Sequence, residues 1–365
     1  MKETPLARAH RAQKARLVDF AGWLMPIQYT GVLDEYHAVR RAAGFFDVSH
    51  MGRIEVAGDQ AEAFLQWIST NDVGGLQVGQ AQYSMVCRAS GGILDDVFIY
   101  KTGHSTFLVC VNASNREKIL GWFLENQQEK YSKAIIRDRS EELAQIAIQG
   151  PASKDIIRKF AGVKIDDLKP RHCLMIDAMG TSSLLSRTGY TGEIGYEWYL
   201  PATQAPKAWD RLLEAGMEYD AKPTGLGARD LLRLDVGYLL YGNDMDENIS
   251  PLEAGAEWVV AWDKGLFLGK PALHKQKEQG FTRKLIAFEM TERGIPRHGM
   301  AIFNEGNAVG RVTSGNFSPI LQKGIGLGSI PPALSQVGTT LEIDIRGKHV
   351  QAQVVKLPFY KRQKS

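Results

Sequence analysis

The sequence predicts a mixed α+β protein of two or three domains that ends in an all-β domain. The chain has 365 residues, which is more than one hydrophobic core usually organises. Amphipathic helical stretches and short apolar strands alternate along it without a long polar linker. After about Lys270, short strand-like runs separated by glycines take over, which is typical of a small barrel or sandwich.

The composition is that of an ordinary globular protein, with 44% hydrophobic and 23% charged residues and a net charge of +3. This small charge argues against a nucleic-acid-binding protein but permits an acidic partner. No stretch resembles a secretory signal or a membrane span. Cys87, Cys110 and Cys173 are far apart, so we expect free thiols in a reducing compartment, the cytoplasm. His172 and Cys173 lack a second pair of ligands, so we expect no metal site.

The first two-thirds of the chain carry clear helix and strand signals. In order, we predict a helix over 59–70, a strand over 107–111, a helix from Ser114 through Phe123, a helix through Phe160 and a helix over 208–214. A short apolar run at Ala147-Ile148 ends at Gly150-Pro151, before the helix through Phe160. Asp59 with Glu62, and Ser114 with Glu117, can form capping boxes. Gly216 is a natural helix stop.

The all-β prediction rests on four short strand-like runs. They cover residues 285–288, 309–312, 341–345 and 350–355. Gly306, Gly315, Gly338 and Gly347 punctuate these runs as turns would. The boundary of this domain is expected near 277–280.

A first candidate for chemistry is the segment Gly91-Gly92-Ile93-Leu94-Asp95-Asp96, which leads into a strand-like run. The two glycines indicate a turn. Asp95 and Asp96 then point to opposite faces of a strand, and Asp96 shares its face with Tyr100. One carboxylate can therefore face a cavity. The alternative is a hairpin turn with a solvated acidic pair.

A second candidate is the stretch 187–197, which holds three glycines in seven residues. Glycines let the backbone approach a ligand closely. Tyr190 offers a ring with a polar tip, and Glu193 and Glu197 can accept hydrogen bonds from a heterocycle that carries N–H groups. The alternative is a glycine-rich loop before a strand, with Glu197 on a solvated face.

A third candidate begins at Gly225 like a dinucleotide fingerprint, but it lacks the third glycine and a clear preceding strand. Arg229, Asp230 and Arg233 have helical spacing. They form either an ion-pair network or a site where Arg229 meets an anionic ligand group.

A fourth candidate comprises the segments 20–26 and 44–52. His50, a lone histidine, is expected to be structural. Met51 fits either the hydrophobic core or a binding site.

Together these segments resemble the T-protein family of the glycine cleavage system, whose members are aminomethyltransferases. The resemblance runs from Trp23 to Phe359, nearly the whole chain. The family's elements occur in order as GWLMP, GFFDVSHMG, GGILDD, VNA, QGP, GYTGE, GLGARDLLRL, LYGND, TSGNFSP and PF. Many separate motifs in the right order are far more specific than any one of them.

The resemblance implies a three-domain cloverleaf around a central channel that holds tetrahydrofolate. A discontinuous folate-binding domain would comprise 1–50 and 140–276, an α+β domain 51–139, and a β-barrel domain 277–365. The family reaction takes an aminomethyl group from the lipoyl arm of the carrier (H) protein. It releases ammonia and yields 5,10-methylenetetrahydrofolate.

The same resemblance assigns roles to residues. Asp96 would be the catalytic carboxylate, Glu197 would contact the pterin, and Arg229 would contact a polar group nearby. The other residues lining the channel would be Met51, Tyr83, Tyr100, Asn112, Tyr190 and Tyr238. A carboxylate suits the reaction because cationic iminium character develops as ammonia leaves, and because a proton must be removed from the attacking nitrogen.

Tyr36, Ile194 and Asp235 depart from the family pattern, which usually has His, Asp and Glu there. Two alternatives are a folate-dependent demethylase of the same fold and a non-catalytic folate-binding protein for iron–sulfur cluster assembly. The complete GGILDD and LYGND elements favour aminomethyl transfer. The loop 187–193 also lacks the cysteine typical of the iron–sulfur relatives. A relative that has lost activity is a third alternative, which the presence of Asp96 disfavours.

Overall fold

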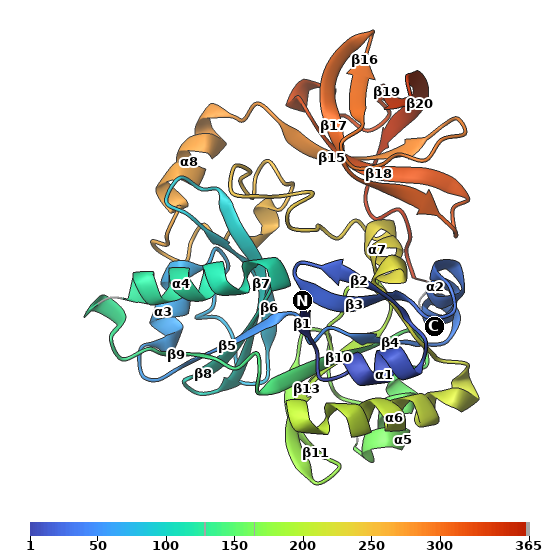
Figure 1. The fold of residues 1–365 in the computed structure, drawn as a ribbon. Coiled ribbons are helices and arrows are strands. Elements are labelled where there is room, and N and C mark those ends of the chain that lie inside the picture. The colour runs from blue at the N-terminus through green and yellow to red at the C-terminus, as the bar shows by residue number, and fades with distance from the viewer. Residues whose placement is uncertain (128, 164, 363–365) are drawn as a thin grey trace. The chain divides into compact units, whose positions relative to one another are not determined.

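The computed structural model describes residues 1–127, 129–163 and 165–362. Within them, helices and strands are mixed up to the last quarter of the chain, which is a closed β-barrel (Figure 1). The predicted mixed fold class and its barrel-like C-terminal part are therefore confirmed. None of the described helices is long and apolar enough to cross a membrane.

The chain forms two compact units. The first comprises Met1–Ile68, Asp72–Ser84 and Asp96–Asp230, and the second comprises Ser69–Asn71, Met85–Asp95 and the residues from Leu231 onward. The division into three domains stays a prediction.

A six-stranded sheet organises the first unit. Its strands run in the order β11 (Cys173–Ala178), β12 (Thr181–Ser186), β13 (Gly195–Pro201), β10 (Leu143–Gln149), β4 (Gly44–Asp47) and β14 (Lys222–Pro223). Neighbouring strands are antiparallel except β14 and β4.

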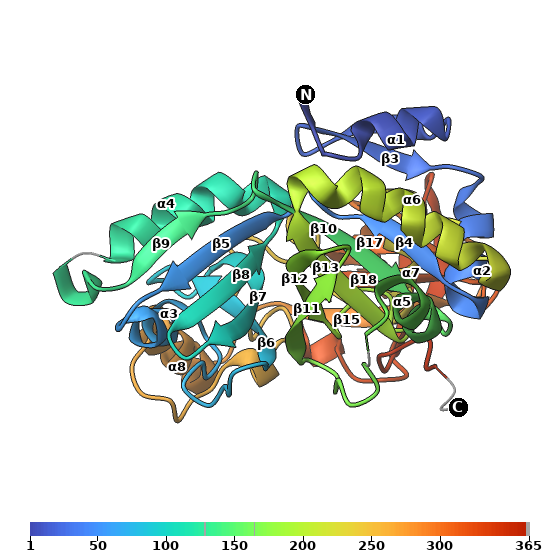
Figure 2. The ribbon, with the colours of Figure 1, turned by 90° about the horizontal axis from the view of Figure 1, so that it is seen from below.

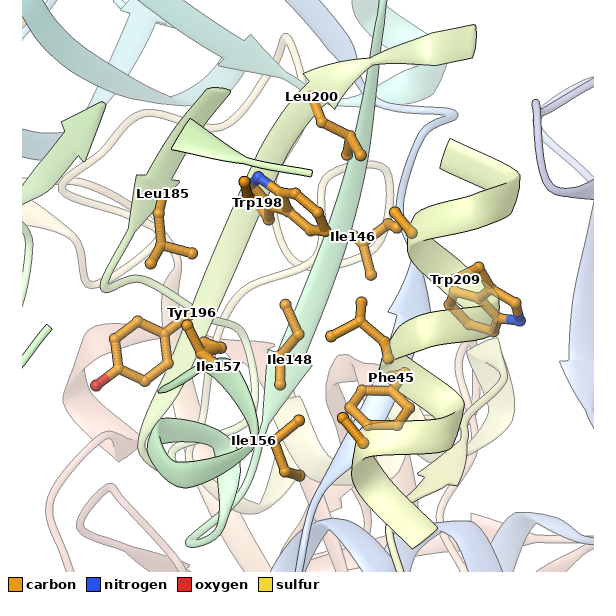
Figure 3. Close-up of a cluster of buried hydrophobic side chains, with 14 of the residues drawn as sticks. Phe45, Ile146, Ile148, Ile156, Ile157, Leu185, Tyr196, Trp198, Leu200 and Trp209 are labelled. Atoms are coloured by element: carbon orange, nitrogen blue, oxygen red, sulfur yellow. The ribbon is translucent and has the colours of Figure 1, made fainter. Parts of the chain in front are cut away.

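Strands β10 and β13 send alternate side chains into two different environments. On one face, Ile146 and Trp198 join a cluster of buried apolar side chains (Figure 3). Helices α5 (Ser153–Ala161) and α6 (Ala205–Gly216) cover this face (Figure 2). Trp209 of α6 belongs to the cluster (Figure 3). The opposite face carries the polar side chains of the candidate site.

A five-stranded sheet has the order β6 (Ala81–Cys87), β7 (Ile93–Gly103), β8 (Thr106–Val111), β5 (Gly52–Ala57) and β9 (Ile135–Asp138). Helices α3 (Ala61–Ile68) and α4 (Arg116–Gln127) contact each other through the rings of Phe64 and Phe123, whose centroids are 5.5 Å apart in an edge-to-face arrangement. The predicted strand over 107–111 is confirmed as β8.

The four predicted helices are confirmed as α3, α4, α5 and α6, with three differences at their ends. Helix α3 begins at Ala61 and ends at Ile68, so Asp59 does not occupy its cap position. Ser114 lies inside a 3₁₀ turn (η1, Ala113–Asn115) that precedes α4, so it does not cap α4; Asn112 is the N-cap of η1, without a side-chain capping bond. Gly216 ends α6, but the chain continues into a 3₁₀ turn, and the left-handed residue is Asp220. Packing requires this glycine, because a Cβ there would lie 2.7 Å from Cζ of Phe45.

The C-terminal barrel closes in the order β15 (Lys284–Met290), β18 (Lys323–Ile330), β17 (Asn307–Ser318), β16 (Ala301–Asn304), β19 (Thr340–Ile345) and β20 (Lys348–Val355). The four predicted runs lie in β15, β17, β19 and β20. Gly315 lies inside β17 and not at a turn; a Cβ there would come within 2.7 Å of the carbonyl oxygen of Pro296. Helices α7 (Leu226–Asp235) and α8 (Lys270–Gln279) precede the barrel in sequence.

The sequence analysis misses β18 because glycines recur at alternate positions along it. A Cβ at Gly326 would lie 2.4 Å from Cζ of Phe288, and one at Gly328 would lie 2.5 Å from Cδ1 of Ile302. These glycines make room for large side chains of the barrel core. A glycine-rich run that resembles a turn is therefore a strand.

The N-terminal segment forms a small sheet and two helices. These are β1 (Lys2–Glu3), β2 (Arg16–Phe20), β3 (Trp23–Gln28), α1 (Ala7–Ala12) and α2 (Val32–Arg41).

A buried carboxylate fastens this segment to the six-stranded sheet. Asp47, the last residue of β4, accepts hydrogen bonds on Oδ2 from Oγ1 of Thr4 at 2.6 Å and from Nε2 of His10 at 2.9 Å. The hydroxyl of Tyr29 lies 2.8 Å from Nδ1 of the same histidine. Burial opposes ionisation of Asp47, but the hydrogen bonds from His10 and Thr4 outweigh it and lower its pKa to about 2.

We expect Asp47→Ala to lower the free energy of unfolding by about 3 kcal/mol at pH 7, because it leaves buried donors without an acceptor. Urea unfolding measures this. Asp34→Ala is the control, since Asp34 is exposed and pairs with Lys222 at the surface; we expect a loss within about 1 kcal/mol.

The same comparison has a pH signature. The folded-state pKa of Asp47, about 2, lies below the value of about 3.9 for an unfolded aspartate. The stabilisation is therefore fully present above about pH 4 and is lost as the pH falls towards 2. A difference between wild type and Asp47→Ala that stays constant over this interval would contradict the assignment.

Candidate functional site

Asp95 and Asp96 lie on β7, directly after the predicted turn. Gly91 has a left-handed backbone with φ 90, and the N–H of Arg88 donates to the carbonyl of Gly92 at 2.9 Å, which confirms the turn. Asp95 is fully buried and Asp96 is partly exposed. The alternative of a solvated acidic pair is therefore wrong.

Two neutral donors orient the carboxylate of Asp96. The hydroxyl of Tyr83 donates to Oδ2 at 3.0 Å, and Nδ2 of Asn112 donates to Oδ1 at 2.6 Å. Tyr83 lies on β6 and Asn112 follows β8, the strands on either side of β7. Both carboxylate oxygens are thus held in place, and a carboxylate oxygen can accept more than one hydrogen bond.

A row of aromatic rings leads from Asp96 towards a second carboxylate. Phe98 lies two residues beyond Asp96 on the same face of β7. Its ring centroid is 6.5 Å from that of Tyr83 and 5.3 Å from that of Tyr100. The ring of Tyr100 in turn lies 5.4 Å from that of Tyr199. Asp96 and Tyr100 share a face of the strand, as the sequence predicts.

The second carboxylate is Glu197 on β13. Its Oε2 accepts hydrogen bonds from Oγ1 of Thr188 at 2.5 Å and from the hydroxyl of Tyr100 at 3.4 Å. Its Oε1 accepts one from Nε2 of Gln145 at 3.0 Å. All three donors are neutral, and no basic side chain among the described residues forms an ion pair with Glu197. The alternative that Glu197 lies on a solvated face is wrong.

Three further predicted residues lie in the first unit. The guanidinium carbon of Arg229, on α7, is 4.6 Å from the ring centroid of Tyr190, a cation–π arrangement. Met51 is partly buried and packs against the apolar cluster that contains Tyr100. Tyr238 is 42% exposed and belongs to the second unit, so its place in the site stays a prediction.

Some of the charged residues singled out in the sequence hold the fold together. Glu193 pairs with Arg40 at 2.9 Å, and their side chains are only 1% and 4% exposed, so Glu193 is a structural residue. Arg233 pairs with Asp244 at 2.9 Å. The ion-pair alternative therefore applies to Arg233.

The departures from the family pattern also have structural roles. Tyr36 is fully buried beneath Arg40, whose guanidinium carbon is 5.3 Å from the ring centroid. The side chain of Ile194 is partly buried and packs against the apolar cluster of the six-stranded sheet. Oδ1 of Asp235 accepts one from the hydroxyl of Ser318 at 2.7 Å.

His50 fits its predicted structural role. Its ring is 2% exposed and lies edge-to-face against Phe20, with the centroids 5.6 Å apart. Burial, together with the positive charges of Arg229 and Arg53, lowers its pKa to about 3 despite the opposing charge of Asp47. His50 is therefore neutral at neutral pH.

Three buried residues near Glu197 were not predicted from the sequence. Gln145 and Thr188 donate to Glu197, and Tyr199 lies between Gln145 and Tyr100 in the hydrogen-bond network. The available signal is a glutamine inside the otherwise apolar run LAQIAI of β10. A second signal is that Tyr199 follows Glu197 by two residues and so shares its face of β13.

Arg53 is another residue that the sequence analysis misses. It is 1% exposed, and its guanidinium donates to the backbone carbonyls of Ser49 at 2.8 Å, Leu143 at 2.8 Å, Met51 and Ser140. These bonds hold the loop that carries Met51. Its position in the strand run gives no sequence signal for this role.

Comparisons with known proteins agree with this architecture. Residues 6–264 match the GCVT N-terminal domain, and residues 283–361 match the glycine cleavage T-protein C-terminal barrel domain. A relative from Desulfitobacterium hafniense named aminomethyltransferase is 46% identical over 363 residues, covering 100% of this chain and 99% of the relative. One of the same name from Halothermothrix orenii is 47% identical over 359 residues, covering 98% and 100%.

A solved structure also matches the chain along its length. It is the glycine cleavage system aminomethyltransferase T from Bartonella henselae, 31% identical, with a TM-score of 0.92 over 99% of this chain and 98% of that one. On the two domain matches and these full-length similarities, the chain belongs to the glycine cleavage T-protein family.

Proposed function

We propose that this protein is the aminomethyltransferase of a glycine cleavage system. It transfers the methylene carbon of an aminomethyl-lipoyl carrier protein to tetrahydrofolate, releases ammonia and forms 5,10-methylenetetrahydrofolate. The observation that carries the proposal is the carboxylate of Asp96, oriented by Tyr83 and Asn112. The relatives named aminomethyltransferase support it. The demethylase and iron–sulfur alternatives are not favoured, and the loop 187–193 has no cysteine.

The folate half of the proposal rests on Glu197 and its surroundings. Because this carboxylate receives hydrogen bonds from neutral groups only, as far as the described residues go, it remains a strong acceptor for the N–H groups of a pterin. Arg229, lying over Tyr190, offers donors to a polar group of the folate. Met51, which is partly buried, offers apolar surface. Tyr100 is fully buried and acts through its hydrogen bond to Glu197, so it does not line the channel as predicted.

The chemistry assigned to Asp96 follows from the bonds that change. Two C–N bonds form between the methylene carbon and the folate nitrogens, while its bonds to the amine nitrogen and to the lipoyl sulfur break. The two protons lost from the folate nitrogens leave with ammonia and with the lipoyl thiol. Asp96 stabilises the cationic carbon–nitrogen centre during this exchange and accepts a proton from an attacking nitrogen.

The experiment that tests the proposal is ammonia release from aminomethyl-lipoyl carrier protein, with and without tetrahydrofolate. We expect folate to stimulate release and methylenetetrahydrofolate to accumulate in equal amount. Tight folate binding without ammonia release would overturn the transferase assignment in favour of a binding protein. Methyl transfer from a sulfur donor without any carrier would favour the demethylase.

We expect Asp96→Asn to reduce kcat by roughly 10²- to 10⁴-fold, the usual contribution of a positioned acid–base group. The dissociation constant for tetrahydrofolate should stay near that of wild type, because the amide keeps the shape of the side chain. Single-turnover ammonia release and folate titration measure the two effects. Asp177→Asn, on the exposed side of β11, is the control; near-normal turnover of Asp96→Asn would remove Asp96 from catalysis.

Glu197→Ala should mainly weaken folate binding. Loss of a charged acceptor corresponds to about a 10- to 100-fold increase in the dissociation constant, measured by calorimetric titration. Glu214→Ala, exposed on α6, is the matched control and should bind folate normally. If both variants bind folate as wild type does, the pterin is not held by Glu197.

A further inference from the structure

A closed ring of hydrogen bonds surrounds Glu197. Nε2 of Gln145 lies 3.0 Å from Oε1 of Glu197 and 3.1 Å from the hydroxyl of Tyr199. The hydroxyl of Tyr199 lies 3.0 Å from that of Tyr100, which lies 3.4 Å from Oε2 of Glu197. Gln145, Tyr199 and Tyr100 are each at most 1% exposed. Three buried neutral side chains therefore hold one partly exposed carboxylate.

Strand register places the ring. Gln145 on β10 pairs directly with Tyr199 on β13, and Ala147 pairs with Glu197. Gln145 therefore reaches Glu197 diagonally, over the small side chain of Ala147. Tyr100 comes from β7 of the other sheet in this unit. The ring thus ties two sheets together at the carboxylate.

The direction of each hydrogen bond follows from Cys110. Its Sγ lies 3.5 Å from Oε1 of Gln145. Burial, chiefly, raises the pKa of this thiol to about 12, so it is protonated and donates at neutral pH. The amide oxygen of Gln145 is then the acceptor from Cys110. Its NH₂ group points to Tyr199 and Glu197.

The orientation of the Gln145 amide also sets the direction of the remaining hydrogen bonds. With its oxygen accepting from Gln145, the hydroxyl of Tyr199 donates to Tyr100, whose own hydrogen is directed at Glu197. The hydroxyl of Thr188 also donates to Glu197. The donated hydrogens of the ring therefore run from Gln145 to Glu197, directly on one side and through Tyr199 and Tyr100 on the other.

The two oxygens of this carboxylate are not supported equally. Thr188 and Tyr100 both donate to Oε2. Gln145 is the only donor to Oε1 among the described residues. Without its amide, the carboxylate plane is held at one oxygen only and can rotate.

We propose that Gln145 is a positioning residue for folate recognition, which fixes the plane of the Glu197 carboxylate so that both oxygens face the N–H groups of the pterin. This inference rests on the proposed function. Gln145 is only 1% exposed, so we expect it to contact neither the transferred carbon nor the attacking nitrogen. Its removal therefore weakens folate binding and leaves the chemical step intact.

The test uses the full-length protein with Gln145→Met, which keeps the volume and removes the amide. We expect the tetrahydrofolate dissociation constant and KM to rise roughly tenfold, with kcat at saturating folate unchanged. Gln351→Met is the matched control, since Gln351 in the barrel also donates to a glutamate, Glu342, at 3.0 Å. It should leave folate binding unchanged.

Two further variants separate positioning from packing. In a Glu197→Ala background, Gln145→Met should have no additional effect on the dissociation constant, because the group it orients is gone. Gln145→Glu should make folate binding pH-dependent. The protonated carboxyl has one O–H, which can donate to Glu197 in place of the amide, and the ionised form repels Glu197, so affinity falls as pH rises. The wild type should lack this dependence.

The outcomes are distinguishable. If Glu197→Ala weakens folate binding but Gln145→Met does not, the positioning role is wrong and the proposed function stands. An equal loss from Gln145→Met in both backgrounds indicates packing and also overturns the inference. If the wild-type protein fails to bind tetrahydrofolate, the proposed function fails, and this inference fails with it.

Discussion

Strand β10 is buried on both of its faces, and the arrangement of the first unit depends on how that burial is achieved. One face meets α5 and α6 with purely apolar side chains. The other carries Gln145, which has no access to water and must find hydrogen-bonding partners inside the protein. Its partners are Cys110, Tyr199 and Glu197. Satisfying one buried amide thus brings a carboxylate to a defined position.

Both carboxylates of the candidate site are oriented by neutral donors. Tyr83 and Asn112 hold Asp96, while Gln145, Thr188 and Tyr100 hold Glu197. A neutral donor fixes the orientation of a carboxylate without compensating its negative charge, whereas an arginine or lysine would compensate it. No basic side chain among the described residues forms an ion pair with Glu197, so its charge remains available to the N–H groups of a ligand.

Charges that are paired or buried elsewhere maintain the frame around these groups. Asp47 accepts hydrogen bonds from Thr4 and His10 of the N-terminal segment. Arg53 donates to the backbone carbonyls of Ser49 and Met51. Glu193, which precedes Glu197 by four residues in the chain, forms a buried ion pair with Arg40. Two glutamates on one glycine-rich stretch therefore have different roles. Glu193 has a cationic partner, whereas Glu197 has only neutral donors among the residues that the structure describes.

The sequence by itself determined the features that depend on local periodicity. The apolar stripe of α3, the strand β8 and the shared face of Asp96 and Tyr100 follow from repeats of 3.6 and 2 residues. The order of many short motifs likewise identified the family and its candidate carboxylates. These signals need no knowledge of distant partners.

Only the tertiary structure decided which polar groups meet. Gln145 and Tyr199 are 54 residues apart and Tyr100 and Glu197 are 97 apart, so their contacts depend on strand register and on the approach of two sheets. Strand β18 was not predicted for the same reason. Its glycines are required by the large side chains that face them, and those side chains lie on other strands of the barrel. Periodicity tells which face a residue occupies, but the partner on that face is set by chain segments distant in sequence.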